Sequence, residues 1–266
     1  KIGLSLSCDE IQARSDVKSL CSLLENKQIN EPKFGLVQLN RVNNKPFLIL
    51  IHPGNGNVYH YRVLSGLLSN TFNVIGINYP VGKKEFSSIE EMAKQYINLL
   101  DQNNILNKPY YFGGWSYGAT VAQEMTRQLK KLKRQLPNYL ILIEGWAKYS
   151  KNLLKKDLFL DAYFEESRPT INNATWIEKF WQSMSDRIAI LLKHTPKKIN
   201  QKTLLIKASI FPYLYVENNS PTSGWGKYIS GNLSIRVVSA GHNDILEGNS
   251  ANVIAEILTQ LVQNTQ

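Results

Sequence analysis

The sequence is poor in several residue types, and each shortage narrows the kind of protein it can be. Only two of its 266 residues are cysteine, Cys8 and Cys21. They lack the spacing of a metal site, which favours a reduced, cytoplasmic setting over a disulfide framework. No apolar run approaches the roughly 20 residues of a membrane helix, and the first residues lack the apolar core of a signal peptide. The chain begins with lysine, and we interpret it as a piece cut from a longer polypeptide.

Acidic residues are also few: 21 aspartates and glutamates stand against 31 lysines and arginines, for a net charge of +10. The basic residues cluster at 130–134, 148–156 and 193–202, but no nucleic-acid-binding motif accompanies them. We interpret the clusters as solvated lysine faces, or as a surface for an acidic protein partner.

Strand-like and helix-like segments alternate along most of the chain. Short apolar runs typical of buried strands occur at 34–39, 47–51, 72–77, 110–112, 139–143, 203–206 and 233–238. Helical periodicity follows at 59–68, 88–100, 117–134 and 251–262. This alternation predicts an α/β fold with a mostly parallel central sheet flanked by helices.

Two segments depart from that alternation. Residues 147–200 hold two amphipathic stretches, 152–166 and 176–192, which we expect to form a helical lid inserted after a strand end, where active sites of α/β sheets lie. Additional packing helices are the alternative. Residues 1–30, which run into a polar linker at 26–33, are expected to lie outside the domain formed by 31–266.

The segment Gly114-Trp115-Ser116-Tyr117-Gly118 fits the G-x-S-x-G pattern. In serine hydrolases this pattern forms a sharp turn from strand to helix that presents the serine hydroxyl at the helix N-terminus. Glycine is needed on both sides because a side chain would collide with the turn. A glycine-rich turn with an incidental serine is the alternative, but the strand before and the helix after favour a nucleophile at Ser116.

A serine nucleophile needs a base, and the base needs an acid to orient it. Of the four histidines, His242 lies after the last strand and before the last helix, where hydrolases keep their catalytic histidine. For the acid we expect Glu144, which ends the apolar strand at 139–143, with Glu217 in a later loop as the competitor. His60 and His194 fall in predicted helices and are interpreted as packing or surface residues.

Acyl transfer also requires hydrogen-bond donors for the oxyanion. The backbone N–H of Tyr117, directly after the serine, supplies one. The second is expected from Gly54, in the glycine-rich loop His52-Pro53-Gly54-Asn55-Gly56-Asn57. This loop lacks the residues of a phosphate-binding P-loop and the spacing of a dinucleotide-binding motif.

The His52–Asn57 loop, the Gly-Gly-Trp-Ser-Tyr-Gly segment, the acid after the next strand, Gly224-Trp225 and Gly241-His242 together resemble the terminal thioesterase domains of nonribosomal peptide synthetases and polyketide synthases. The resemblance runs from about residue 34 to the end. It implies an α/β-hydrolase fold with a lid, and a Ser116-His242-Glu144 triad. This family usually has aspartate where Glu144 stands.

The resemblance also implies a function. Such a domain binds no cofactor or metal of its own; it takes an acyl or peptidyl chain from the phosphopantetheine of an upstream carrier domain and releases it by hydrolysis or macrocyclisation. Residues 4–24 are similar to the end of a carrier domain, so 1–30 are expected to be a carrier remnant and linker. The alternatives are a discrete editing thioesterase, a general serine esterase, or a binding module without catalysis.

Overall fold

The computed structural model describes residues 35–80, 86–163, 174–210, 214–216 and 219–264. Its centre is a seven-stranded sheet with the strand order β1-β3-β2-β4-β5-β6-β7. The strands are β1 (Leu36–Gln38), β2 (Phe47–Ile51), β3 (Asn73–Ile77), β4 (Tyr110–Trp115), β5 (Leu140–Ile143), β6 (Thr203–Ala208) and β7 (Leu233–Val238). Only β1 pairs antiparallel, along β3, and the other pairs are parallel. The predicted mostly parallel sheet is confirmed.

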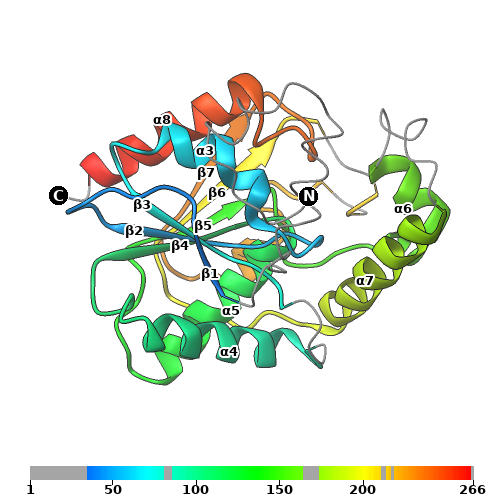
Figure 1. Cartoon of the computed structure of the whole chain (residues 1–266), viewed down its shortest axis with the longest axis horizontal. Helices are drawn as coiled ribbons and strands as arrows, with labels where there is room; N and C mark the ends of the chain where they lie inside the picture. The colour runs from blue at the N-terminus through cyan, green and yellow to red at the C-terminus, as the bar shows by residue number, and fades with distance from the viewer. Residues whose placement is uncertain (1–34, 81–85, 164–173, 211–213, 217–218, 265–266) are drawn as a thin grey trace, which may run out of the picture.

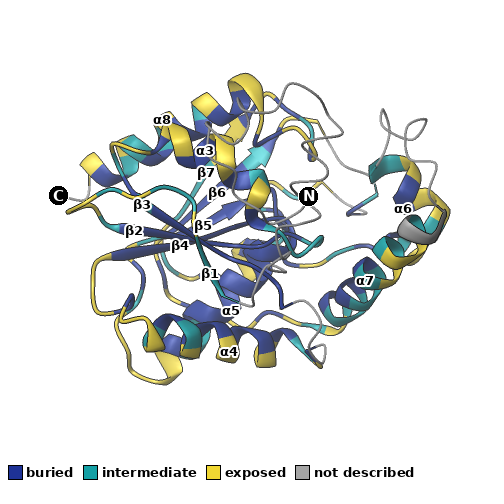
Figure 2. Cartoon of the chain, in the orientation of Figure 1, coloured by how far each residue is buried: buried dark blue, intermediate teal, exposed yellow. Residues whose placement is uncertain are grey.

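Helices cover both faces of the sheet, as Figure 1 shows. Helices α3 (Arg62–Leu67) and α8 (Gly248–Gln263) lie on one face, and α4 (Ile89–Gln102) and α5 (Tyr117–Lys131) lie on the other. Two separate apolar cores fill the spaces between the helices and the sheet. The central strands β2, β4 and β5 are buried along their whole length, as expected for parallel strands covered on both faces (Figure 2).

The remaining helices lie to one side of these layers. The short 3₁₀ helix η2 (Lys151–Leu154) leads into α6 (Lys156–Tyr163), and α7 (Ala174–Lys193) returns toward β6. They share a third, smaller apolar cluster that includes Trp146, Leu153, Phe159 and Met184. The helices expected at 152–166 and 176–192 are therefore present, apart from residues 164–173, which lie outside the described residues. The predicted segment 1–30 also lies outside them.

One strand is longer than the sequence suggested. A strand was expected to end at Phe112, but β4 continues through Gly113 and Gly114 to Trp115. The two glycines resemble a turn in the sequence, yet they pair with β2 and β5. A Cβ on Gly113 would lie 2.9 Å from Leu50 Cδ2, so a larger residue here would have to displace the end of the Leu50 side chain.

Candidate active site

Ser116 occupies the turn between β4 and α5 with a strained backbone, φ 55° and ψ −121°. It is the N-cap of α5, but its side chain makes no capping hydrogen bond, although serine at this position ordinarily caps. Its N–H donates to Ile143 O at 2.9 Å, which fixes the turn to the end of β5. Strain of this kind persists only where the surroundings enforce it, and it concentrates at functional sites.

Two glycines allow that turn to form. A Cβ on Gly114 would lie 2.2 Å from the carbonyl carbon of Gly118, and a Cβ on Gly118 would lie 2.4 Å from Ile51 O. Both contacts are with backbone, which cannot move aside. The first turn of α5 is therefore pressed against the ends of β2 and β4, as the G-x-S-x-G pattern predicted.

Tyr61, at the end of the 3₁₀ helix η1 (Val58–Tyr61), joins the same strand ends. Its hydroxyl donates to Ile51 O at 2.8 Å and accepts from the Trp115 N–H at 2.7 Å. Burial raises its pKa, so the phenol stays protonated. The sequence did not reveal this role. It predicts that Tyr61 lies in the helix at 59–68, but not that its hydroxyl bonds to two strands that are distant in sequence.

His242 lies in the loop after β7, whose turn is closed by Asp244 accepting from the Gly241 N–H at 2.6 Å. Its ring is 7% exposed and packs between aromatic rings, with centroids 5.3 Å from Trp115, 5.1 Å from Trp146 and 4.0 Å from Tyr215. Burial lowers its pKa from 6.5 to about 3. Its Nδ1 is buried and forms no hydrogen bond with any described residue.

Glu144 follows β5 directly, with a positive φ of 40°, and is 2% exposed. Its Oε2 accepts from the Ala208 N–H at 2.5 Å, so the carboxylate lies against the end of β6. Burial raises its pKa to about 7, against the opposing effects of that hydrogen bond and of Lys207. Glu144 and His242, the expected acid and base, thus both follow parallel strands at one sheet edge, but in this structure the carboxylate bonds to Ala208.

The expected oxyanion donors lie on the two segments that meet at the elbow. Tyr117 is the first residue of α5, where N–H groups have no partner within the helix. Gly54 lies in a tight turn closed by the Gly56 N–H donating to Pro53 O at 2.9 Å. This loop packs on α5, since the ring of His52 stacks on the ring of Tyr117 at 5.7 Å between centroids.

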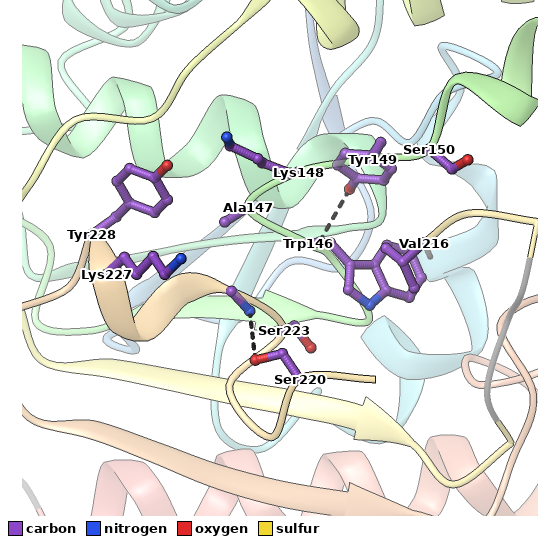
Figure 3. Close-up of a pocket in the computed structure, with 11 residues that line it drawn as sticks. Trp146, Ala147, Lys148, Tyr149, Ser150, Val216, Ser220, Ser223, Lys227 and Tyr228 are labelled. Atoms are coloured by element: carbon purple, nitrogen blue, oxygen red, sulfur yellow. Dashed lines mark hydrogen bonds between the residues drawn. The ribbon is translucent and has the colours of Figure 1, made fainter. Parts of the chain in front are cut away.

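The loop after Glu144 supplies a further residue that the sequence did not reveal. The hydroxyl of Tyr149 accepts from the Trp146 N–H at 3.3 Å and interacts with the Ser116 side chain. Its pKa is raised by burial, so it is a neutral phenol beside the serine. Figure 3 shows Tyr149 and Trp146 at the wall of a cavity of about 340 Å³, faced across the opening by Lys227 and Tyr228. The described residues that line this cavity include neither Ser116 nor His242.

The competing acid, Glu217, lies outside the described residues. Within the described ranges, no group of three or more His, Cys, Asp or Glu side chains is arranged to hold a metal ion. None of the helices in these ranges is both long enough and apolar enough to cross a membrane.

Comparison with known proteins identifies the family to which the chain belongs. The profile of the family described as "Thioesterase domain" matches residues 46–261. The sheet, its flanking helices and the strand–serine–helix turn define an α/β-hydrolase. The chain belongs to the thioesterase family.

Curated relatives are much longer than this chain. It is 25% identical over 163 residues to enterobactin synthase component F of Escherichia coli (strain K12), covering 59% of this chain and 12% of the relative. It is 24% identical over 296 residues to a dimodular nonribosomal peptide synthase of Bacillus subtilis (strain 168), covering 97% of this chain and 12% of the relative.

Solved structures show the same fold at low sequence identity. The NocB thioesterase domain from the nocardicin cluster matches with a TM-score of 0.68 and 18% identity, covering 85% of this chain and 97% of that one. A four-domain nonribosomal peptide synthetase, holo-AB3403, matches with a TM-score of 0.74 and 21% identity, covering 98% of this chain and 22% of that one.

The glycines of the elbow lead to a stability prediction. Gly118→Ala should destabilise the protein by about 1–3 kcal/mol or more, because the added methyl overlaps the Ile51 carbonyl. Gly66→Ala is the matched control: Gly66 is an exposed residue of α3 with no atom within 4 Å of the added Cβ. That change should stabilise the protein by about 0.5–1 kcal/mol. Urea unfolding of both variants tests this, and equal effects would contradict the packing argument.

Two buried titratable groups should give stability changes of opposite sign with pH. The pKa of His242 is lowered from 6.5 to about 3, so the stability from its neutral form is present above pH 6.5 and lost as pH falls toward 3. The pKa of Glu144 is raised from 4.5 to about 7. The stability that comes from the neutral form of Glu144 is therefore present below pH 4.5 and lost as pH rises through 7.

Melting temperatures measured from pH 4 to pH 8 test these signs. Relative to wild type, His242→Asn should gain stability as pH falls, and Glu144→Gln should gain stability as pH rises. Differences from wild type that do not change with pH would show that neither group is shifted by burial.

Proposed function

We propose that this chain releases an acyl or peptidyl chain from the phosphopantetheine thioester of a carrier domain, through an ester formed on Ser116. The observation that carries the proposal is the strained serine at the start of α5, whose hydroxyl does not cap the helix. Membership in the thioesterase family and the similarity to a nonribosomal peptide synthase support the choice of a carrier-bound substrate.

In the proposed reaction, His242 accepts the proton of Ser116 as the serine oxygen forms a bond to the thioester carbon. The N–H groups of Tyr117 and Gly54 stabilise the oxyanion. The carbon–sulfur bond then breaks, His242 gives its proton to the sulfur, and the phosphopantetheine leaves as a thiol, so that His242 is again neutral. Water, or an amine or hydroxyl of the chain itself, next attacks the ester and gives its proton through His242 to Ser116.

Glu144 is the proposed acid of this triad. Support comes from its place at the end of β5, its burial and its hydrogen bond to the end of β6, the strand beside the one that leads into the His242 loop. The buried His242 Nδ1 needs an acceptor, and a turn of the Glu144 side chain away from Ala208 would provide one. Glu217 is the alternative acid, and mutation separates the two.

The proposed partner is an upstream carrier domain in the same polypeptide, with residues 1–30 as its remnant and the linker. The chain spans 12% of the synthases described above, so most of such a polypeptide would lie outside this sequence. Exposed basic residues at the end of α5, 130–134, would attract an acidic carrier. In this proposal the domain binds no cofactor itself, since the phosphopantetheine arrives with the carrier.

A fluorophosphonate probe tests the nucleophile and the acid together. Wild-type protein should form a single adduct, mapped to Ser116 by mass spectrometry, and Ser116→Ala should lose labelling and thioesterase turnover by at least about 1,000-fold. Glu144→Gln should slow labelling by on the order of 100- to 10,000-fold, because the base loses its orienting anion.

Glu217→Gln is the matched control and should label at the wild-type rate. Slow labelling of Glu217→Gln, with fast labelling of Glu144→Gln, would move the acid to the later loop. An absence of labelling in wild type would favour a binding module without catalysis. Turnover of short alkyl esters in preference to acyl-pantetheine thioesters would indicate a general esterase.

A further inference from the structure

Helix α7 places a buried arginine against the loop that holds Gly54. Arg187 is 3% exposed, and its Nε donates to Gly54 O at 2.5 Å. Its guanidinium lies 4.7 Å from the centre of the Tyr79 ring, at the distance of a cation–π contact. Met184, one turn earlier on the same face of α7, would lie 3.0 Å from a Cβ added to Gly54. The helix therefore touches Gly54 through both packing and a hydrogen bond.

The peptide before Gly54 is fixed from inside the loop. Pro53 O lies 2.8 Å from His52 Nδ1 and accepts from the Gly56 N–H at 2.9 Å. Burial lowers the pKa of His52 to about 3, so its neutral ring carries one proton, and a carbonyl acceptor places that proton on Nδ1. Since the peptide is planar, holding Pro53 O also sets the direction of the Gly54 N–H.

The peptide after Gly54 is fixed by Arg187. Its carbonyl is the acceptor for Nε, so the two peptides that flank Gly54 are held by different parts of the fold. The loop is also confined on the side of the elbow, where a Cβ on Gly118 would lie 2.4 Å from Ile51 O and 2.8 Å from His52 O. A shift of α7 would therefore rotate Gly54 relative to an elbow that stays in place.

We propose that Arg187 is a positioning residue that holds the Gly54 carbonyl and, together with the contacts on Pro53 O, keeps the Gly54 N–H directed toward the developing oxyanion, so that this orientation depends on the place of helix α7. The inference rests on the proposed function, because it needs Ser116 as the acylated residue. An oxyanion forms only in the transition state, so loss of Arg187 should lower kcat and leave KM nearly unchanged. The effect should approach that of removing one oxyanion donor, about 100-fold in kcat.

The test compares wild type with Arg187→Lys and Arg187→Ala on an acyl-pantetheine thioester, with fluorophosphonate labelling of Ser116 measured in parallel. Arg187→Lys keeps the positive charge but cannot reproduce the Nε–H donor, and should lose about 100-fold in kcat with KM within about twofold of wild type. Labelling should slow along with kcat. Arg236→Lys is the control, because Arg236 is exposed on β7 and its Nη1 donates, among the described residues, only to the neighbouring Ile235 O, and it should behave as wild type.

Chemical rescue separates positioning from a general loss of structure. Ethylguanidinium should restore part of the kcat of Arg187→Ala by refilling the space over Tyr79 and donating to Gly54 O. Wild-type kcat in either variant, a rise confined to KM, or a loss of kcat that ethylguanidinium does not reverse would overturn the proposal. Failure of wild-type protein to label at Ser116 would instead overturn the proposed function.

Discussion

The structure depends on one close contact, in which the first turn of α5 is pressed against the ends of β2 and β4. Gly114 and Gly118 meet there at distances that no side chain could occupy, and the serine between them takes a positive φ as a result. The contact fixes the serine to the sheet and brings the His52–Gly54 loop to the same place. The roles proposed for Glu144, His242 and Gly54 all depend on a serine that is held in place by this contact.

Burial shifts the pKa values of Glu144 and His242 in opposite directions, and both shifts favour the neutral form of the side chain. It raises the pKa of Glu144 to about 7 and lowers that of His242 to about 3, so both neutral forms are favoured. A base of low pKa is a weak proton acceptor until a counterion stabilises its charged form. In the structure Glu144 Oε2 accepts from the Ala208 N–H and no described residue bonds to His242 Nδ1. In the proposed reaction, formation of a Glu–His pair and activation of the serine are therefore expected to occur together.

The sequence predicted those parts of the site that local patterns determine. The elbow followed from glycine spacing, and Glu144 and His242 were found where parallel strands end, because such ends share one sheet edge. Tyr61, Tyr149 and Arg187 were missed as site residues. Each acts on a partner distant in sequence, as Arg187 does on Gly54, 133 residues away, and no local period or spacing encodes such a contact. The extension of β4 was missed for a similar reason, since its glycines face β2 and β5.

The helices beside the sheet are physically part of the site they cover. Trp146 and Tyr215 belong to the apolar cluster shared with α6 and α7, and these same rings bury His242. Arg187, from α7, holds Gly54. Displacing α7 would therefore hydrate the base, raise its pKa toward 6.5 and release the loop of the second donor. In the proposed reaction, a substrate that displaced α7 on entry would therefore loosen both contacts, and the chemistry is expected to follow once the helices have returned to their place over the bound chain.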